Sequence, residues 1–392
     1  MTATAGPALY SRTLFPELEK LHTTGIYPAQ SIEEFVAKRY ISADPPITDD
    51  QIQPASIDLR LGPVAYRVRA SFLPGRNSTV LRKAEPYTTH QLDLSRPTVM
   101  ERGCVYIVPL LEKWNLPPYV SGKANPKSSI GRIDVFTRLI TDYGTEFERV
   151  PAGYTGTLYA EIVPRTFSIL VEEGTRMNQV RFVRGNPRPA DSDITEMHED
   201  QPLFYEEDEA LAELPVFQGV WIRVDLEGIQ GSDVVGYKAK AHAPLIDVNK
   251  VDFYDPSEFW EAIYKPKSRQ LILNPSDFYI LASRERISVP PQAAAELRGY
   301  DSSVGEVRIH YAGFFDPGFG YGQNGLKGAH AVLEVRSHEV PLLLEDGQRV
   351  GRVVFERLMT EPHRVYGPAI GSHYQQQGLS LSKHFKRYGP YG

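Results

Sequence analysis

The sequence is poor in the residues and segments that several protein classes require. Cys104 is the only cysteine among 392 residues, so no disulfide can form within one chain. Neither C-x-x-C nor H-x-E occurs, so the usual zinc signatures are absent. No apolar run approaches the roughly 18 residues that span a bilayer, and the first residues lack a basic region followed by a hydrophobic block. We therefore expect a cytoplasmic protein that does not enter a membrane.

A basic excess is also missing. The chain has 43 Lys and Arg against 49 Asp and Glu, a net charge of −6 and a pI near 6.0. Non-specific nucleic-acid binding needs clustered cations that neutralise phosphates, so we expect no nucleic-acid partner. A small anionic ligand stays open, because it needs only a few placed cations.

Helical patterns are few and short. Ser31 and Glu34 form a capping-box pattern that predicts a helix over 31–40. Asp255, followed by Pro256, predicts a second helix over 255–264.

Strand patterns dominate instead. Alternating runs at 56–61, 157–162 and 331–335 are separated by turn residues, and the chain contains 31 Gly and 31 Pro. The sequence therefore predicts a mainly β protein with many tight turns.

One long pattern occurs twice. The stretch from Tyr106, reading Y-I-V-P-L-L-E-K-W-N-L-P-P, returns from Tyr279 as Y-I-L-A-S-R-E-R-I-S-V-P-P. Glu161 and Glu334 keep the same offset as these two tyrosines. The register predicts a duplicated domain.

An acidic, proline-containing segment separates the two copies. Residues 186–215 lack strand periodicity as far as Pro202, and we interpret them as a linker with a short helix near 206–214. The domains are then 1–185 (copy one) and 216–392 (copy two).

The copies differ in one loop. Copy one has K-S-S-I-G-R from Lys127 to Arg132, whereas copy two has D-S-S-V-G-E from Asp301 to Glu306. Two hydroxyls and two cations can hold a phosphate through charge-assisted hydrogen bonds, although a polar turn between strands would look the same. The anions of copy two would repel a phosphate. This difference indicates that the copies have divided their roles.

Each copy also carries a glutamate in the middle of a strand pattern. Glu161 lies in Y-A-E-I and Glu334 in V-L-E-V. A carboxylate among apolar residues has a raised proton affinity and can act as a general base, whereas one on a solvated strand face would have no such role.

Together these motifs resemble the dCTP deaminase and dUTPase superfamily over most of both copies. The matching segments are P-A-S-I-D-L-R-L-G at 54–62, K-S-S-I-G-R at 127–132, H-Y-A-G-F-F-D-P-G-F at 310–319, V-L-E-V at 332–335 and E-D-G-Q-R-V-G-R-V-V-F at 345–355. Tyr366 with H-Y-Q-Q-Q-G at 373–378 is similar to the closing tail of the deaminases. The resemblance implies two tandem dUTPase-like domains, each a distorted β-barrel or jelly roll with few short helices.

The resemblance also implies roles for individual residues. The residues that match catalytic positions are Ser128, Arg132 and either Glu334 or Glu161 as the base. Those that match substrate-binding positions are Lys127 and Ser129 beside the triphosphate, Ala312 or Thr141 through a backbone carbonyl, Asp316 at the deoxyribose or base, and Tyr366, His373 and Gln377 in the closing tail. His373 stands where the family has Lys, and Lys127 where it has Arg. We expect one composite site, with the Ser-Ser loop from copy one and the hairpin and glutamate from copy two.

The implied activity is hydrolytic deamination of dCTP to dUTP and ammonia, feeding dUMP and dTTP synthesis, without a protein-bound zinc. Mg²⁺ is expected to accompany the triphosphate with few protein ligands. Family precedent implies a homo-oligomer with trimer-like rings of domains.

Two alternatives remain. A dUTP pyrophosphatase or a bifunctional enzyme would share the fold, but such enzymes usually end in R-G-x-G-G-F-G, whereas this chain continues Q-Q-Q-G-L-S-L-S-K-H-F. A non-catalytic nucleotide-binding regulator is the second alternative, favoured by Asp301 and Glu306.

Overall fold

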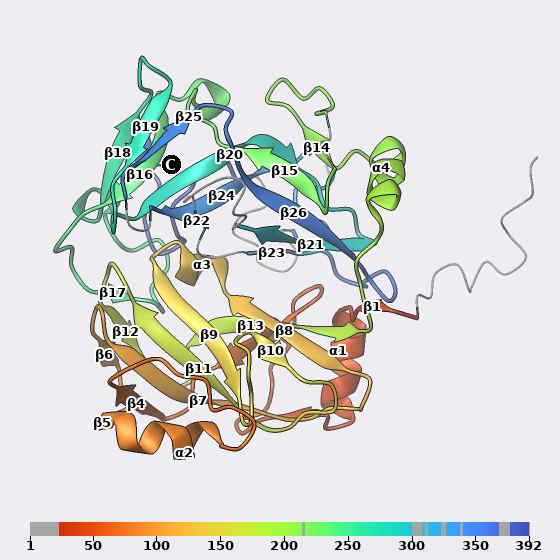
Figure 1. Ribbon diagram of the computed structural model, residues 1–392, viewed down its shortest axis with the longest axis vertical. Coiled ribbons are helices and arrows are strands. Elements are labelled where there is room, and N and C mark those ends of the chain that lie inside the picture. Colours follow the sequence, from red (N-terminus) through yellow and green to blue (C-terminus); the bar gives the residue numbers. More distant parts are fainter. Residues whose placement is uncertain are drawn as a thin grey trace, which may run out of the picture.

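The computed structural model describes residues 23–213, 216–299, 308–309, 313–322, 327–337, 340–367 and 377–391. Strands dominate these residues, as the sequence predicts. Figure 1 shows two stacked bodies, with copy one in red to yellow and copy two in green to blue, and α3 (Ser128–Gly131) at their boundary. Within the described ranges, no helix is long and apolar enough to cross a membrane.

Copy one is built on two main sheets. The first runs β1 (Gly25–Ile26), β13 (Arg176–Arg184), β8 (Ser121–Pro126), β10 (Arg149–Val150), with β3 (Ile57–Arg60) also on β13. The second runs β5 (Thr88–Asp93), β4 (Val64–Val68), β7 (Val105–Asn115), β11 (Thr155–Pro164), β9 (Val135–Thr141), with β2 (Ile41–Ser42) on β7.

Copy two repeats this plan. One sheet runs β15 (Val220–Arg223), β26 (Arg349–Arg357), β21 (Ala293–Arg298), β23 (Phe314–Phe315). The other runs β18 (Trp260–Tyr264), β16 (Val234–Ala239), β20 (Tyr279–Ile287), β24 (Ala329–Arg336), β22 (Arg308–Ile309), with β14 (Phe204–Tyr205) on β20. A ribbon of β19 (Gln270–Leu273) and β25 (Leu342–Glu345) completes this half.

An arginine–glutamate pair with a buried carboxylate recurs at equivalent places in the two copies. In copy one the backbone N–H of Arg60 donates to Glu112 Oε2 at 2.9 Å, and its Nε donates to Oε1 at 2.8 Å. In copy two Arg223 makes the same two contacts with Glu285. The duplication read from the sequence therefore extends to side-chain geometry.

The two copies share an apolar boundary. The ring of Phe167 from copy one lies 5.7 Å from Phe259 and 5.5 Å from Trp260 of copy two, between ring centroids. The sheet formed by β6 (Thr98–Met100) and β12 (Ile169–Val171) continues, in parallel, into β17 (Ile246–Asp247) of copy two. These contacts fix the copies against each other, which matters because the site lies between them.

The helices differ from the predictions in detail. The first, α1 (Ala29–Ala37), begins after Pro28, so Ser31 lies inside the helix and the predicted capping box does not form. Asp255 does cap a turn by accepting from the Ser257 N–H at 2.8 Å, but only Pro256–Glu258 is helical (3₁₀) and the chain continues as β18. The prediction of a helix over 255–264 is therefore wrong beyond Glu258. Among the residues that the structure describes, the other α-helices are α2 (Val80–Ala84) and α4 (Asp191–Asp200).

The segment between the copies is more ordered than the linker interpretation implies. It contains α4, and β14 joins the sheet of copy two through Phe204, which pairs with Ile287. The helix predicted near 206–214 is wrong, because the described residues 206–213 contain turns and a single bridge. The alternating runs at 157–162 and 331–335 lie in β11 and β24, and the run at 56–61 extends one residue beyond each end of β3, which confirms those strand predictions.

Candidate active site

A pocket of about 350 Å³ lies between the two copies, and we call it the interdomain pocket. Copy one contributes the α3 loop and strand residues, and copy two contributes the β23 hairpin, β24 and the C-terminal tail. The residues around it are Asp50, Gln53, Asp58, Lys127, Ser128, Ser129, Arg132, Gln179, Leu297, Gly313, Phe314, Phe315, Asp316, Phe319, Val332, Glu334, Tyr366, Gln377 and Lys383.

The Ser-Ser loop is a single helical turn that ends β8. Lys127 is the N-cap of α3, and its N–H donates to the Met177 carbonyl at 2.9 Å, which ties the loop to β13. Ile130 is buried beneath the turn, so the loop cannot move freely away from the sheet. This anchoring presents Lys127 and Ser128 to the pocket.

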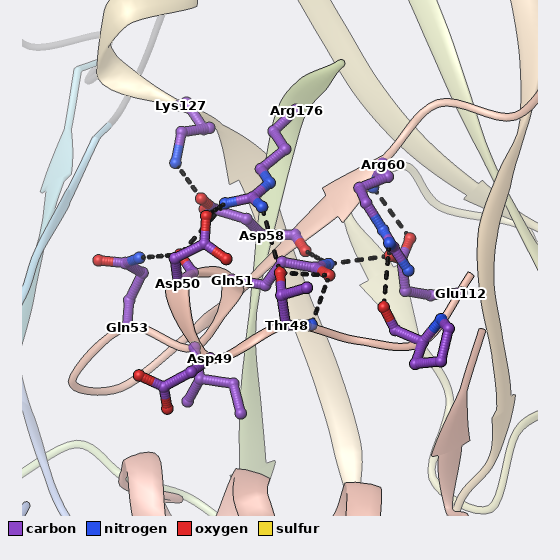
Figure 2. Close-up of polar contacts among 12 residues, drawn as sticks. Thr48, Asp49, Asp50, Gln51, Gln53, Asp58, Arg60, Glu112, Lys127 and Arg176 are labelled. Carbon is purple, nitrogen blue, oxygen red and sulfur yellow. Dashed lines mark hydrogen bonds and ion pairs between the residues drawn. The ribbon is translucent and has the colours of Figure 1, made fainter. Parts of the chain in front are cut away.

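One end of the pocket is rich in charge. Figure 2 shows Lys127 pointing at Asp58, with which it forms an ion pair, and Arg176 on Asp50. The Oδ1 atom of Asp58 is buried and accepts no hydrogen bond from the residues that the structure describes. Lys383 of the tail lines the same pocket.

Lys383 is a buried cation among charges of both signs. Burial lowers its pKa, and the nearby cations Lys127 and Arg176 act in the same direction, while Asp58 opposes them. Lys383 and Lys127 repel each other, and a phosphate bound between them would reduce that repulsion. The two lysines are therefore well placed to bind a polyanion.

The pocket also contains a buried glutamate. Glu334 lies in the middle of β24, and burial raises its pKa to about 8, although Arg132 beside it acts in the opposite direction. Arg132 Nε lies 3.9 Å from Glu334 Oε1. A carboxyl group with this proton affinity can exchange protons near neutral pH.

Two ion pairs cross the boundary side by side. Arg132 from copy one faces Glu334, and two positions further along each chain segment Asp134 binds Arg336, with Arg336 Nε 3.3 Å from Asp134 Oδ1. The copy-one segment carries a cation at 132 and an anion at 134, whereas the copy-two segment carries an anion at 334 and a cation at 336. A shift of one segment by two residues would therefore place like charges opposite each other. The pairs therefore fix the register of Arg132 and Glu334.

The tail closes over the loop. Arg132 Nη2 donates to Gln377 Oε1 at 2.6 Å and Nη1 to the Ser380 carbonyl at 3.2 Å. Gln377 is held in turn by the His330 carbonyl at 2.9 Å, and Ser382 Oγ donates to the Ser129 carbonyl at 2.7 Å. Arg132 thus contacts both the buried glutamate and the tail.

The site residues expected from the sequence fall into three groups. Those around the interdomain pocket are Lys127, Ser128, Ser129, Arg132, Asp316, Glu334, Tyr366 and Gln377. Glu161 and Thr141 lie on the paired strands β11 and β9 of copy one and do not line this pocket. Ala312 and His373 lie outside the described residues.

The two candidate bases have different surroundings. Glu161 Oε1 accepts a hydrogen bond from Arg138 Nε at 3.0 Å, within copy one. Glu334 faces Arg132 across the boundary and lies in the pocket with Ser128. The geometry therefore brings Glu334, and not Glu161, to the K-S-S-I-G-R loop.

Sequence reasoning missed several residues around the pocket. Asp58 belongs to the quoted P-A-S-I-D-L-R-L-G motif, so that motif held a signal, but Gln179 and Lys383 had none beyond their proximity to recognised segments. Arg181, whose Nη2 donates to Asp316 Oδ1, likewise had no signal in the sequence.

Within the described ranges, no three His, Cys, Asp or Glu side chains gather as a metal-binding group.

Replacing Lys383 by Met is expected to weaken binding of a nucleoside triphosphate about 10-fold, the effect of losing one charge-assisted contact. Binding of the matching monophosphate should change little, because we expect Lys383 to contact the outer phosphates. Calorimetric titration of dCTP and dCMP measures both. Lys386→Met, an exposed cation three positions further along the tail, is the control. Equal weakening for both nucleotides would contradict this role.

Replacing Glu334 by Gln is expected to raise the melting temperature by a few degrees near pH 8. The folded-state pKa is about 8 against a usual value of 4.5, so the folded protein loses stability as the pH rises between these values. A neutral amide removes that loss. Thermal unfolding from about pH 5 to pH 8 should show a widening gap from wild type. A gap that stays constant with pH, as expected for the exposed Glu173→Gln, would contradict a raised pKa.

The fold and the pocket define a duplicated, mainly β protein with a charged pocket between its two copies. Family models match both halves: the 2'-deoxycytidine 5'-triphosphate deaminase N-terminal domain over residues 23–186 and the C-terminal domain of the same family over residues 190–385. The chain is a member of the dCTP deaminase family of hydrolytic enzymes, with the two domains fused in one chain.

Individual relatives agree with this assignment. A "dCTP deaminase, dUMP-forming" of Halobacterium salinarum is 34% identical over 142 residues, which are 35% of this chain and 67% of the relative. A protein of the same name from Leifsonia xyli is 32% identical over 157 residues, covering 37% and 72%. The crystal structure of 2'-deoxycytidine 5'-triphosphate deaminase from Agrobacterium tumefaciens has a TM-score of 0.81 and 48% identity, covering 86% of this chain and all (100%) of that one.

Proposed function

We propose that the protein deaminates dCTP to dUTP and ammonia in the interdomain pocket. The observation that carries the proposal is the pairing, in one pocket, of a buried glutamate of raised pKa with a loop of hydroxyls and cations from the other copy. The family membership and the names of the relatives support the same reaction.

Glu334 is the proposed general base. In its ionised form it takes a proton from a water molecule, whose oxygen forms a bond to C4 of cytosine. The proton passes to N3. A second proton moves from the new C4 hydroxyl to the exocyclic amino group, the bond between C4 and that nitrogen breaks, and ammonia leaves as C4 becomes a carbonyl. Arg132 beside Glu334 stabilises the ionised carboxylate, and Ser128 supplies a hydroxyl to the same pocket.

Lys127 and Lys383 are the proposed triphosphate ligands, because both line one end of the pocket and compete for the same anion, Asp58. We propose that Mg²⁺ enters with the triphosphate, bound mainly by phosphate oxygens and water, and neutralises phosphate charge.

Formation of dUMP is a second candidate outcome. Several relatives carry the name "dCTP deaminase, dUMP-forming", whereas others are named only "dCTP deaminase". A bifunctional site would cleave dUTP to dUMP and pyrophosphate after deamination, at the phosphate end of the pocket.

The finer architecture and assembly belong to the same proposal. We propose that each copy is a dUTPase-like distorted barrel and that chains associate as homo-oligomers in the cytoplasm, as the family resemblance implies. Light scattering of the purified protein measures the mass; a monomer would contradict the assembly.

Ammonia and pyrophosphate release from dCTP, dCMP, dUTP and cytidine tests the activity. We expect ammonia from dCTP alone. Pyrophosphate in equal amount to ammonia would favour the dUMP-forming reaction. Tight dCTP binding without ammonia release would contradict catalysis and favour a nucleotide-binding regulator.

A further inference from the structure

The geometry points to Arg181 as a positioning residue for the nucleoside end of the interdomain pocket. We infer that it holds Asp316 so that this carboxylate accepts a hydrogen bond from a hydroxyl or amino donor of the nucleotide. The inference rests on the proposed nucleotide site but assigns a residue and a role beyond it.

Arg181 is a fully buried cation that crosses the boundary between the copies. It lies on β13 of copy one with 0% of its surface exposed. Its Nη2 donates to the Phe315 carbonyl at 2.8 Å and to Asp316 Oδ1 at 3.1 Å. Its guanidinium carbon lies 4.0 Å from the centroid of the Phe314 ring. One side chain therefore contacts three successive residues of the hairpin that lines the pocket.

The other guanidinium nitrogen anchors Arg181 to the sheet of copy two. Nη1 donates to the Ala295 carbonyl at 2.8 Å and lies 3.4 Å from Glu356 Oε2. A guanidinium presents several N–H donors in a fixed geometry, which a flexible ammonium could not do. The hairpin is thus held against β21 and β26 through a residue of the other copy.

The repeat shows that this contact is not part of the common fold. Arg181 and Val354 occupy equivalent positions in the two copies. Arg181 lies two residues after Gln179, which pairs with Asn125 on β8. Val354 lies two residues after Arg352, which pairs with Arg298 on β21, and β8 and β21 each lead to the Ser-Ser sequence of their copy. The fold accepts an apolar side chain at this position in copy two. A buried guanidinium in copy one, beside a pocket, is consistent with a role at that pocket.

Asp316 is arranged as an acceptor. Arg181 donates to Oδ1, and the hydrogen bonds found among the described residues leave Oδ2 without a donor. Burial raises the pKa of Asp316, and Arg181 lowers it. The other charged groups that face it are Asp58 from β3, which raises the pKa, and Lys127, which lowers it. Without Arg181 the carboxyl group would hold its proton to higher pH and would lose acceptor capacity.

A purely structural role makes a different prediction. Arg181 also neutralises Glu356, which it shares with Lys123 at 3.7 Å. If neutralising Glu356 were its only role, Glu356→Gln would relieve the effect of removing Arg181. If Arg181 acts through Asp316, Glu356→Gln leaves that contact in place and rescues nothing.

The test compares the pH dependence of KM for dCTP in wild type, Arg181→Met, Glu356→Gln, the double variant of these two, and Arg223→Met. Arg223 is the control because it forms a buried-carboxylate pair with Glu285 in copy two and does not line the pocket. We expect Arg181→Met to raise KM about 10- to 100-fold, the loss of a charge-assisted contact, with a smaller change in kcat. The acid side of the 1/KM profile should move to higher pH.

Several outcomes would overturn the inference. They are an unchanged KM profile in Arg181→Met, recovery of KM in the double variant, or the same profile change in Arg223→Met.

Should Arg181→Met not fold, Arg181→Lys and Asp316→Asn serve instead. Arg181→Lys should show a partial shift of the profile, and combining it with Asp316→Asn should add nothing to Asp316→Asn alone. An additive effect would contradict action through Asp316. Wild type without deamination activity would instead refute the proposed function, and dCTP affinity measured by calorimetry would still report on Arg181.

Discussion

Replacing Glu334 by Gln is expected to lower kcat for dCTP by about 10²- to 10⁴-fold, the usual effect of losing a general base. The amide keeps the size of the side chain but cannot take a proton from water. In wild type the pKa near 8 predicts that kcat/KM rises with pH up to about that value, because the base must be ionised. Steady-state ammonia release across the pH range measures both effects.

Glu161→Gln is the matched control for this prediction. Glu161 occupies the equivalent position in copy one, is equally buried and binds Arg138 outside the interdomain pocket. We expect this variant to keep a kcat near that of wild type. Full activity of Glu334→Gln together with loss of activity in Glu161→Gln would show that the working base belongs to copy one.

Replacing Arg132 by Ala is expected to lower kcat/KM for dCTP by at least about 10- to 100-fold, since one charge-assisted contact accounts for that much. The guanidinium lies beside Glu334 and donates to Gln377 and the Ser380 carbonyl, so its loss removes a charge from the site and releases the tail. Steady-state kinetics with dCTP measure the loss, and susceptibility of the tail to proteolysis reports its release.

Arg149→Ala provides the comparison, because Arg149 is an exposed arginine of the same copy. It should behave as wild type. Arg132→Lys should recover only part of the loss, because one ammonium cannot make the divergent contacts of a guanidinium. Unchanged kinetics in Arg132→Ala would contradict its role in the site.

The sequence predicted β3, β11 and β24 because short runs with apolar residues are bounded by turn residues, although β3 and β24 are buried on both faces. It failed at 255–264, where Asp255 caps a turn as expected but Trp260 begins a strand that pairs with Ala239 of β16. Sheet pairing outweighed the local helical signal there. At α1 the turn closes on the Pro28 carbonyl, which accepts from the Ser31 N–H at 3.0 Å, so the helix starts before the residue that resembles a cap.

The candidate site was predictable where its residues lie in recognisable motifs. The K-S-S-I-G-R loop and the V-L-E-V strand both line the pocket, and the repeat directed attention to the difference between Arg132 and Glu306. Lys383 and Arg181 were not predictable, because their positions depend on how the tail and the two copies pack. The choice between Glu161 and Glu334 likewise required the arrangement of the copies.

A crystal structure of Glu334→Gln with dCTP would test the central claim most directly. The account predicts one nucleotide per composite site, with the triphosphate at Lys127 and Lys383 of the two copies and the cytosine beside residue 334. A nucleotide bound beside Glu161, or one whose phosphates lie away from Lys127, would contradict a site that is shared between the copies.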